Sequence, residues 1–178
     1  GRSEVSPAVG VRVALIIFVV AILQVSAFSS LTIGGSGPDV LLVILVSVAL
    51  LRGAVTGAVA GFFAGLIVDV ATLGTLGLTA LLLTLAGYWV GRYGETTGRA
   101  RRHAPILAML AATVFVGLGG YSVQSMPGES ISSRPVLLAP PSALLWNAVL
   151  IYPAFGLTRR IVGAPDRVER AREVELLV

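Results

Sequence analysis

Six apolar segments, separated by shorter polar stretches, run along the chain. They lie at residues 11–28, 38–51, 54–70, 76–90, 104–123 and 142–158. The second, third and fourth segments hold 14 to 17 residues. At 1.5 Å per residue this is about 21 to 26 Å, short of the roughly 30 Å hydrocarbon thickness of a bilayer. We therefore expect these helices to borrow flanking residues or to cross a locally thinned membrane.

This pattern predicts an all-α membrane protein. We expect a bundle of six transmembrane helices over residues 1–158, and a basic, amphipathic cytoplasmic tail over residues 159–178. The first segment has an alternative interpretation as a signal peptide, because residues 25–27, Val-Ser-Ala, resemble a small-residue cleavage site.

The amino-acid composition supports a membrane location. Apolar residues make up 56% of the chain and Asp, Glu, Lys and Arg only 12%, about half the charged fraction of a soluble domain. The chain has no cysteine and one histidine, which excludes disulfides, thiol catalysis and zinc-ribbon sites. The sequence predicts no metal, no cofactor and no catalytic constellation, so we expect no enzymatic activity.

The arginines are distributed unevenly about the predicted spans. All 13 basic residues are arginine, and six spans place twelve of them on one side and only Arg134 on the other. The positive-inside rule assigns the arginine-rich side, with both termini, to the cytoplasm. Arg99, Arg101 and Arg102 can also attract anionic lipid. These arginines are not interleaved with aromatic residues and belong to no nucleic-acid-binding fold. Membrane topology therefore explains their distribution better than a nucleic-acid partner does.

Glycines recur at intervals of four residues along the third segment. Gly53, Gly57, Gly61 and Gly65 are followed by Asp69 at the same interval. In lipid, small residues at this spacing let another helix backbone approach closely. Gly87 and Gly91 form a second small pair in the fourth segment. The spacing does not decide whether the crossing helix belongs to the same chain, to a partner or to a second copy.

Two carboxylates lie near the outer ends of the spans. Asp39 begins the second segment, where unpaired N–H groups and the helix dipole stabilise a carboxylate. Asp69 ends the third segment, where the dipole is unfavourable, so it needs a partner. A loop N–H, Thr72 or Thr75, or a protonated Asp39 would serve. A carboxylate in a membrane is also a functional candidate, so a transport role is the alternative to a structural one.

Two further polar residues are candidates for structural roles. Arg52 lies 17 residues before Asp69, about 26 Å of helical rise, so the two cannot meet along the helix. Asn147, in the sixth segment, is expected to hydrogen-bond across helices.

A series of residues from the second to the fourth segment carries a family resemblance: Pro38-Asp39, Leu51-Arg52-Gly53, Gly57, Gly61-Phe62, Gly65-Leu66, Asp69, Gly74, Leu76-Gly77-Leu78 and Gly87-Tyr88. This series resembles MreD, the membrane subunit of the bacterial rod-shape system. One departure is Ala54, where many members have proline. Within the series, the candidates for helix packing or partner binding are Gly53, Gly57, Gly61, Phe62, Gly65 and Gly87.

The resemblance implies a non-enzymatic scaffold of the bacterial cytoplasmic (inner) membrane. Such a scaffold binds the single-span protein MreC. With MreC it helps couple the RodA glycosyltransferase and a class-B penicillin-binding protein, which build peptidoglycan, to cytoplasmic MreB filaments.

The MreD family is also similar to the substrate-binding subunits of energy-coupling-factor vitamin transporters, which are six-helix proteins of similar size. This likeness supplies a competing function. The predicted outer loops offer mainly Thr, Ser, Gly and Pro, with Asp39, Asp69, Glu129 and Arg134, which is little for a tight vitamin site. A scaffold should co-purify with a single-span partner, whereas a transporter subunit should co-purify with ATPases or a vitamin.

Overall fold

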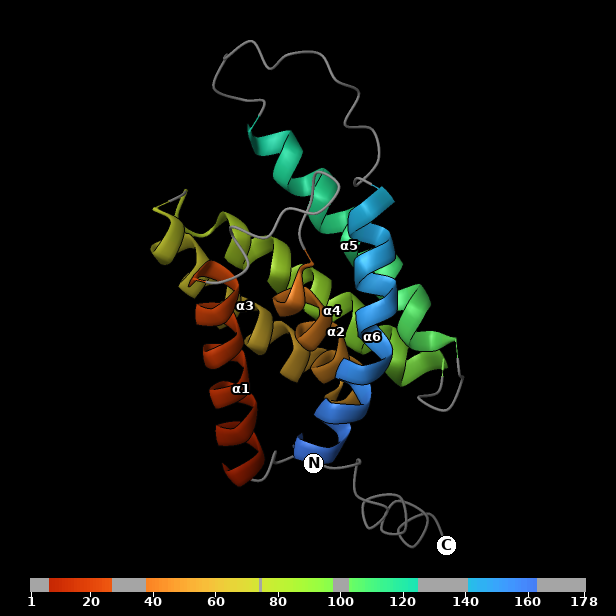
Figure 1. The fold of residues 1–178 in the computed structure, drawn as a ribbon. Helices are drawn as coiled ribbons and strands as arrows, with labels where there is room; N and C mark the ends of the chain where they lie inside the picture. Colours follow the sequence, from red (N-terminus) through yellow and green to blue (C-terminus); the bar gives the residue numbers. More distant parts are fainter. Residues whose placement is uncertain (1–6, 27–37, 74, 98–102, 125–140, 163–178) are drawn as a thin grey trace, which may run out of the picture.

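A computed structural model describes residues 7–26, 38–73, 75–97, 103–124 and 141–162 of the chain. In these ranges it contains six helices and no strand (Figure 1). The helices are α1 (Pro7–Ser26), α2 (Val40–Arg52), α3 (Ala54–Thr72), α4 (Leu78–Thr97), α5 (Ala104–Gln124) and α6 (Pro141–Val162). The prediction of an all-helical protein is confirmed for this part of the chain.

The helices extend beyond several of the apolar segments. The fourth segment ends at residue 90, but α4 continues to Thr97. The sixth segment ends at residue 158, but α6 continues to Val162 and has Arg159 and Arg160 in its last turn. Hydropathy ends where side chains become polar, whereas a helix continues as long as its backbone hydrogen bonds do. Residues 163–178 of the predicted tail lie outside the described residues.

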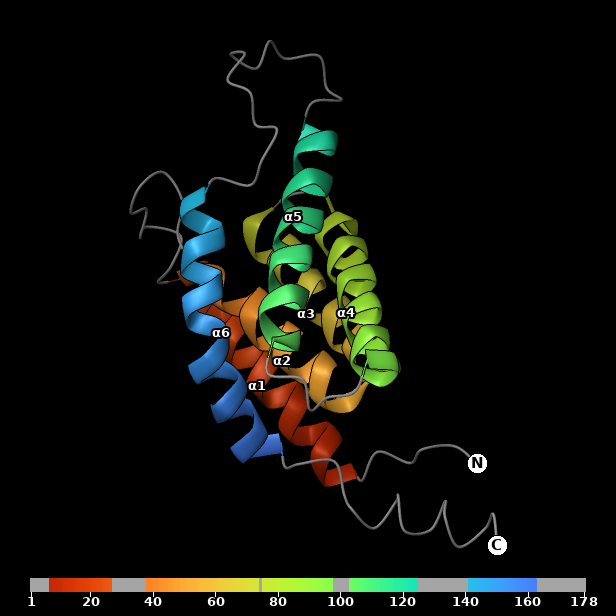
Figure 2. The same cartoon turned by 90° about the vertical axis from the view of Figure 1, so that its right-hand side faces the viewer.

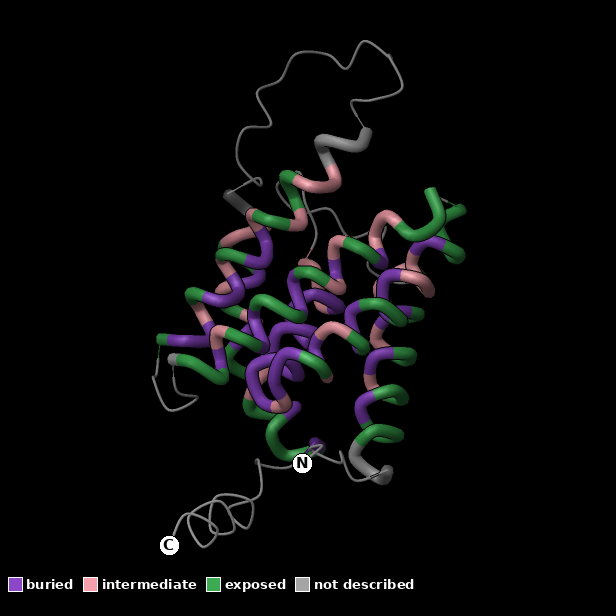
Figure 3. Tube along the Cα trace, turned by 180° about the vertical axis from the view of Figure 1, so that it is seen from behind, coloured by how far each residue is buried: buried purple, intermediate pink, exposed green. Residues whose placement is uncertain are grey.

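Helix α2 lies at the centre of the bundle. Every residue from Leu41 to Leu51 is buried, and α2 contacts each of the other five helices. Figure 3 shows the buried segments gathered in the middle and the exposed ones along the outside. A helix that is apolar all round is typical of such a core position.

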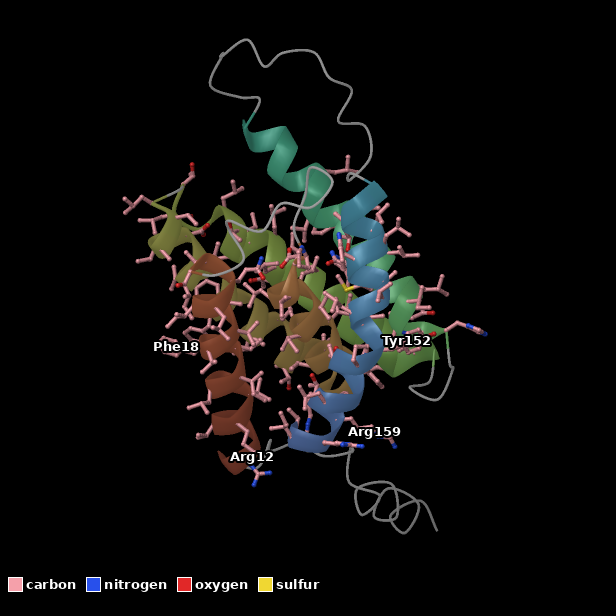
Figure 4. The ribbon with its side chains drawn as sticks, in the orientation of Figure 1. Arg12, Phe18, Tyr152 and Arg159 are labelled. Carbon is pink, nitrogen blue, oxygen red and sulfur yellow. The ribbon has the colours of Figure 1, made fainter. Side chains whose placement is uncertain are left out.

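The outer helices expose large apolar side chains. Among the side chains of α1 whose burial is described, residues 10–26, one stripe is buried: Val13, Ile17 and Ala21. Phe18 of α1 and Tyr152 of α6 point outward on opposite sides of the bundle (Figure 4). In water an apolar surface of this extent would favour association, whereas in a membrane it faces lipid or a partner helix.

One described helix, α3, is long and apolar enough to cross a membrane by itself. Shorter apolar stretches occupy Gly10–Ser26, Val40–Arg52 and Ala104–Gly120. Arg12 of α1 and Arg159 of α6 lie at the same end of the bundle (Figure 4).

Candidate functional site

The glycine stripe of α3 lies directly against α4. A Cβ atom added at Gly57 would fall on the backbone carbonyl of Gly87, and one added at Gly61 would fall on that of Leu83. Gly65 meets the backbone of α4 in the same way. We call this contact the α3–α4 seam. The close crossing that the spacing predicts therefore occurs within the chain, where backbone packing replaces the hydrophobic drive that lipid removes.

Gly91 extends the α3–α4 seam by one turn. A Cβ atom added there would meet the backbone of Gly53 and Ala54. Phe62 takes no part in the seam, because its side chain is 46% exposed on another face of α3. Its ring packs edge-to-face on that of Phe63, with centroids 5.5 Å apart. Phe62 therefore stays a candidate for contact with lipid or a partner.

Gly53 makes the turn between α2 and α3. Its φ of 91° lies in the left-handed region, which glycine adopts without steric cost. Its N–H donates to the carbonyl of Ala49 at 2.8 Å, and its carbonyl accepts from the N–H of Gly57 at 3.0 Å. The neighbouring Arg52 donates from its guanidinium to the carbonyl of Val162. This bond ties the end of α2 to the C-terminus of α6, where a cation is favourable.

Asp69 caps the helix that follows its own. Its Oδ2 accepts hydrogen bonds from the N–H groups of Gly77 at 2.9 Å and Ala80 at 3.2 Å, and its Oδ1 accepts from Thr79 at 3.2 Å. The first turn of a helix leaves its N–H groups unpaired, and its dipole favours an anion. Backbone N–H groups are thus the partners of this buried carboxylate, whereas the hydroxyl of Thr72 donates within its own helix.

Glu95 of α4 provides the matching cap at the opposite end of the α3–α4 seam. Its Oε1 accepts from the N–H of Ala54, the first residue of α3, at 2.8 Å. Its Oε2 lies 3.6 Å from Nη1 of Arg92, with both side chains at least partly exposed. Each helix of the α3–α4 hairpin therefore carries a carboxylate that caps the other.

Glu95 was not predicted from the sequence, because the fourth apolar segment ends at residue 90. A signal was present in the spacing. Gly87, Gly91 and Glu95 lie four residues apart, just as the stripe on α3 ends in Asp69. A small-residue stripe that ends in an acid on each of two neighbouring helices indicates an antiparallel pair with reciprocal caps.

Two side chains hydrogen-bond at the N-terminus of α2: Gln24 from α1, and Asp39, which directly precedes α2. Gln24 of α1 accepts from the N–H of Val40 at 3.0 Å and donates to the carbonyl of Pro38 at 3.3 Å. Asp39 caps its own helix, because its Oδ1 accepts from the N–H of Leu42 at 3.0 Å. Sequence reasoning missed Gln24, whose place at the end of an apolar run gives no indication of its partner.

Asn147 joins α6 to α2 and α5. Its Oδ1 accepts from the N–H of Asp39 at 3.1 Å, and its Nδ2 donates to Oγ1 of Thr113 at 3.1 Å. The Thr113 hydroxyl in turn donates to the carbonyl of Met109 at 2.9 Å. The two hydrogen bonds of Asn147 connect helices within the bundle, whereas that of Thr113 lies within α5. Since unpaired polar groups are costly in lipid, these bonds stabilise the helix ends.

An apolar groove of about 690 Å³ lies between α1 and α3. Its lining includes the exposed side chains of Leu15 and Phe18 from α1 and of Val59 and Phe63 from α3. We call it the α1–α3 groove. The predicted lipid-contacting residues Arg99, Arg101 and Arg102 lie outside the described part of the chain.

The family model described as rod shape-determining protein MreD matches residues 8–161. No curated protein and no solved structure matches the chain, so its likeness to energy-coupling-factor subunits stays a prediction. MreD proteins are membrane proteins with a structural role in cell shape. Because the match extends from the first turn of α1 to the last turn of α6, the chain belongs to the MreD family of rod shape-determining membrane proteins.

Proposed function

We propose that the protein is a non-enzymatic scaffold that spans the bacterial inner membrane six times and binds MreC. Through MreC it helps couple peptidoglycan synthesis by RodA and a class-B penicillin-binding protein to MreB filaments. The observation that carries the proposal is the α1–α3 groove, an apolar groove between two helices in a protein of this family. The hydrogen bonds at the helix ends support a structural role over ligand binding.

The proposed topology places both termini in the cytoplasm. Twelve of the 13 arginines then lie on the cytoplasmic side, as the positive-inside rule requires. Cysteines at Thr72 and Thr96, two exposed threonines at opposite ends of the hairpin, test this directly. Thr72→Cys should react with an impermeant maleimide in intact cells, and Thr96→Cys only after permeabilisation. Labelling of Thr96→Cys in intact cells would overturn the topology.

We propose that the α1–α3 groove is the binding site of the MreC helix. The glycines of α3 are already occupied by α4, so a partner helix needs another surface. Single-span helices pack in apolar grooves through side chains spaced three and four residues apart. The exposed Leu15 and Val59 would then contact the partner.

Cysteine crosslinking in this cysteine-free chain tests the proposed binding site. Leu15→Cys or Val59→Cys should form disulfides with cysteines in the MreC helix. Leu145→Cys on α6, which is 68% exposed against 64% for Leu15, should not. Ala14→Leu, which adds bulk inside the groove, should reduce co-purification of MreC. Normal co-purification with no crosslink at either groove position would place MreC elsewhere.

The carboxylates separate the scaffold from a transporter. Asp39→Asn and Asp69→Asn keep an oxygen that accepts backbone hydrogen bonds but remove the charge. We expect both variants to support rod shape. Asp69→Asn should support it less well, because both carboxylate oxygens of Asp69 accept hydrogen bonds and an amide has only one oxygen. If both abolish shape while MreC co-purifies normally, the charge itself is required and a transport function replaces the scaffold.

A further inference from the structure

The α1–α3 groove does not run the full length of the two helices. Its lining extends from Gly10 to Phe18 on α1 and from Val55 to Ile67 on α3. These stretches rise about 12 and 18 Å, close to the roughly 15 Å of one leaflet of the hydrocarbon core. In Figure 1, α1 and α3 lie close together where both helices end and separate towards the end where both begin. The groove is therefore a wedge that closes beyond Phe18.

The apolar faces of both helices continue past the closed end of the groove. Four residues after Phe18, Ile22 lies on the same face of α1 and is 45% exposed, but it does not line the groove. Three residues after Ile67, Val70 of α3 is 58% exposed and also lies outside the lining. Because apolar side chains continue where the groove does not, the approach of the two helices ends the groove.

Gln24 holds α1 at this closed end. Its side chain accepts a hydrogen bond from the N–H of Val40 at 3.0 Å and donates one to the carbonyl of Pro38 at 3.3 Å. Both partners are backbone groups at the start of α2, so the two bonds fix this end of α1 against the centre of the bundle. Gln24 is the only polar residue between Arg12 and Ser26.

The other end of α1 is less constrained. Val13 and Ile17 bury apolar side chains there, but a Cβ atom added at Gly10 meets nothing within 4 Å. The first turns of α1 also extend past the start of α3 (Figure 2). The wedge is thus open at the end of α1 that apolar packing holds, and closed at the end that Gln24 holds.

We propose that Gln24 is a positioning residue that keeps the α1–α3 groove closed beyond Phe18 and so confines the partner helix to the open part of the wedge. The inference rests on the proposed binding of the MreC helix in this groove. In the proposed topology the open part lies in the cytoplasmic leaflet. A helix is about 10 Å across, so the partner must diverge from α1 and α3 in the outer leaflet.

Cysteine crosslinking to a series of cysteines along the MreC helix tests which part of α1 the partner contacts. Val11→Cys and Leu15→Cys, in the groove lining, should form disulfides. Ile22→Cys, on the same face of α1 but beyond the closed end, should not. An Ile22→Cys yield equal to that of Leu15→Cys would overturn the confinement and leave the binding site in place.

Variants of Gln24 test the clamp itself. Gln24→Met has a similar size but makes neither hydrogen bond, so the Ile22→Cys yield should rise about fivefold for each bond lost. Gln24→Glu keeps an oxygen that accepts from the N–H of Val40 and should stay closer to the wild type. Leu23→Met, on the neighbouring and exposed residue, is the matched control and should change nothing. A yield that Gln24→Met leaves unchanged would overturn the role of Gln24.

Spin labels at Ile22→Cys and Val70→Cys test the clamp without the partner. Electron paramagnetic resonance should give a longer and broader separation of these labels in Gln24→Met than in the wild type. If no position in the groove forms a crosslink, the proposed function fails, whereas an unchanged label separation contradicts the clamp alone. The comparison of Ile22→Cys with Leu15→Cys needs no change at Gln24, so it tests the confinement even if Gln24→Met does not fold.

Discussion

The two faces of α4 carry small residues, yet one is closed and the other is open. Towards α3, Gly87 and Gly91 meet glycine or backbone, and the main chains touch. Towards α5, Ala86 lines an apolar groove of about 530 Å³ together with Ala108 and Ala112. We call it the α4–α5 groove. The methyl groups of these alanines and the larger side chains of Trp89 and Phe115 line this space. The α3–α4 pair therefore closes where α3 presents glycine at every turn of the crossing.

The α3–α4 seam is also fixed at both ends. Asp69 and Glu95 each cap the other helix, so sliding of α3 along α4 would break hydrogen bonds as well as packing. The cap by the buried Asp69 is costly to lose in lipid, where water does not replace it. The caps therefore fix the position of α3 along α4.

The largest expected effect comes from breaking the seam. Gly61→Leu places a side chain on the carbonyl of Leu83, and we expect a loss of about 1 to 3 kcal/mol or failure to fold, because backbone cannot yield as a side chain does. Gly156→Leu in α6, where an added Cβ meets nothing, is the control. Fluorescence-detected gel filtration of detergent extracts distinguishes them. Equal monodisperse yields would contradict the seam.

Removing the buried cap is expected to have a similar or slightly smaller effect. Asp69→Ala leaves the N–H groups of Gly77, Thr79 and Ala80 without their acceptor, so unfolding should become easier by about 2 to 3 kcal/mol. Asp69→Asn should lie between the alanine variant and the wild type. Thermal unfolding in detergent measures this order, and an alanine variant as stable as the asparagine variant would argue against the cap.

The cap at the other end should contribute less, because Glu95 is exposed to solvent. Glu95→Ala should cost about 0.5 to 1 kcal/mol, since water can replace the carboxylate at the N–H of Ala54. Glu95→Gln keeps an acceptor and should be close to the wild type. Melting temperatures of the two variants, compared with those of the Asp69 variants, test whether depth in the bundle sets the strength of a cap.

The smallest effect is expected on the open face. Ala111→Leu adds volume to the α4–α5 groove from an exposed position, so the stability should change by less than about 0.5 kcal/mol. The same alanine-to-leucine change at the buried Ala64, which is fully enclosed, should destabilise strongly. If the two variants melt alike, the two environments do not differ as the comparison requires.

The sequence by itself determined the helices of this protein and the glycine stripe, because these are local. Runs of apolar residues specify helices in lipid, and an interval of four residues puts Gly57, Gly61 and Gly65 on one helix face whatever the fold is. Helix ends were less accurate, because polar residues such as Glu95 continue a helix after hydropathy has fallen. The sequence also indicated that Asp39 stabilises the N-terminus of its helix, although Asp39 lies at the N-cap and not in the predicted first turn.

Only the tertiary structure decided which groups meet. The stripe was compatible with a partner in the same chain or another, and α4 occupies it because the intervening turn brings that helix back across α3. Asn147 reaches Asp39 over 108 residues of sequence, and Gln24 reaches α2 from α1. No local pattern encodes such pairs, since they depend on how five helices surround α2. The two grooves arise in the same way, as spaces left where neighbouring helices do not pack closely along their whole length.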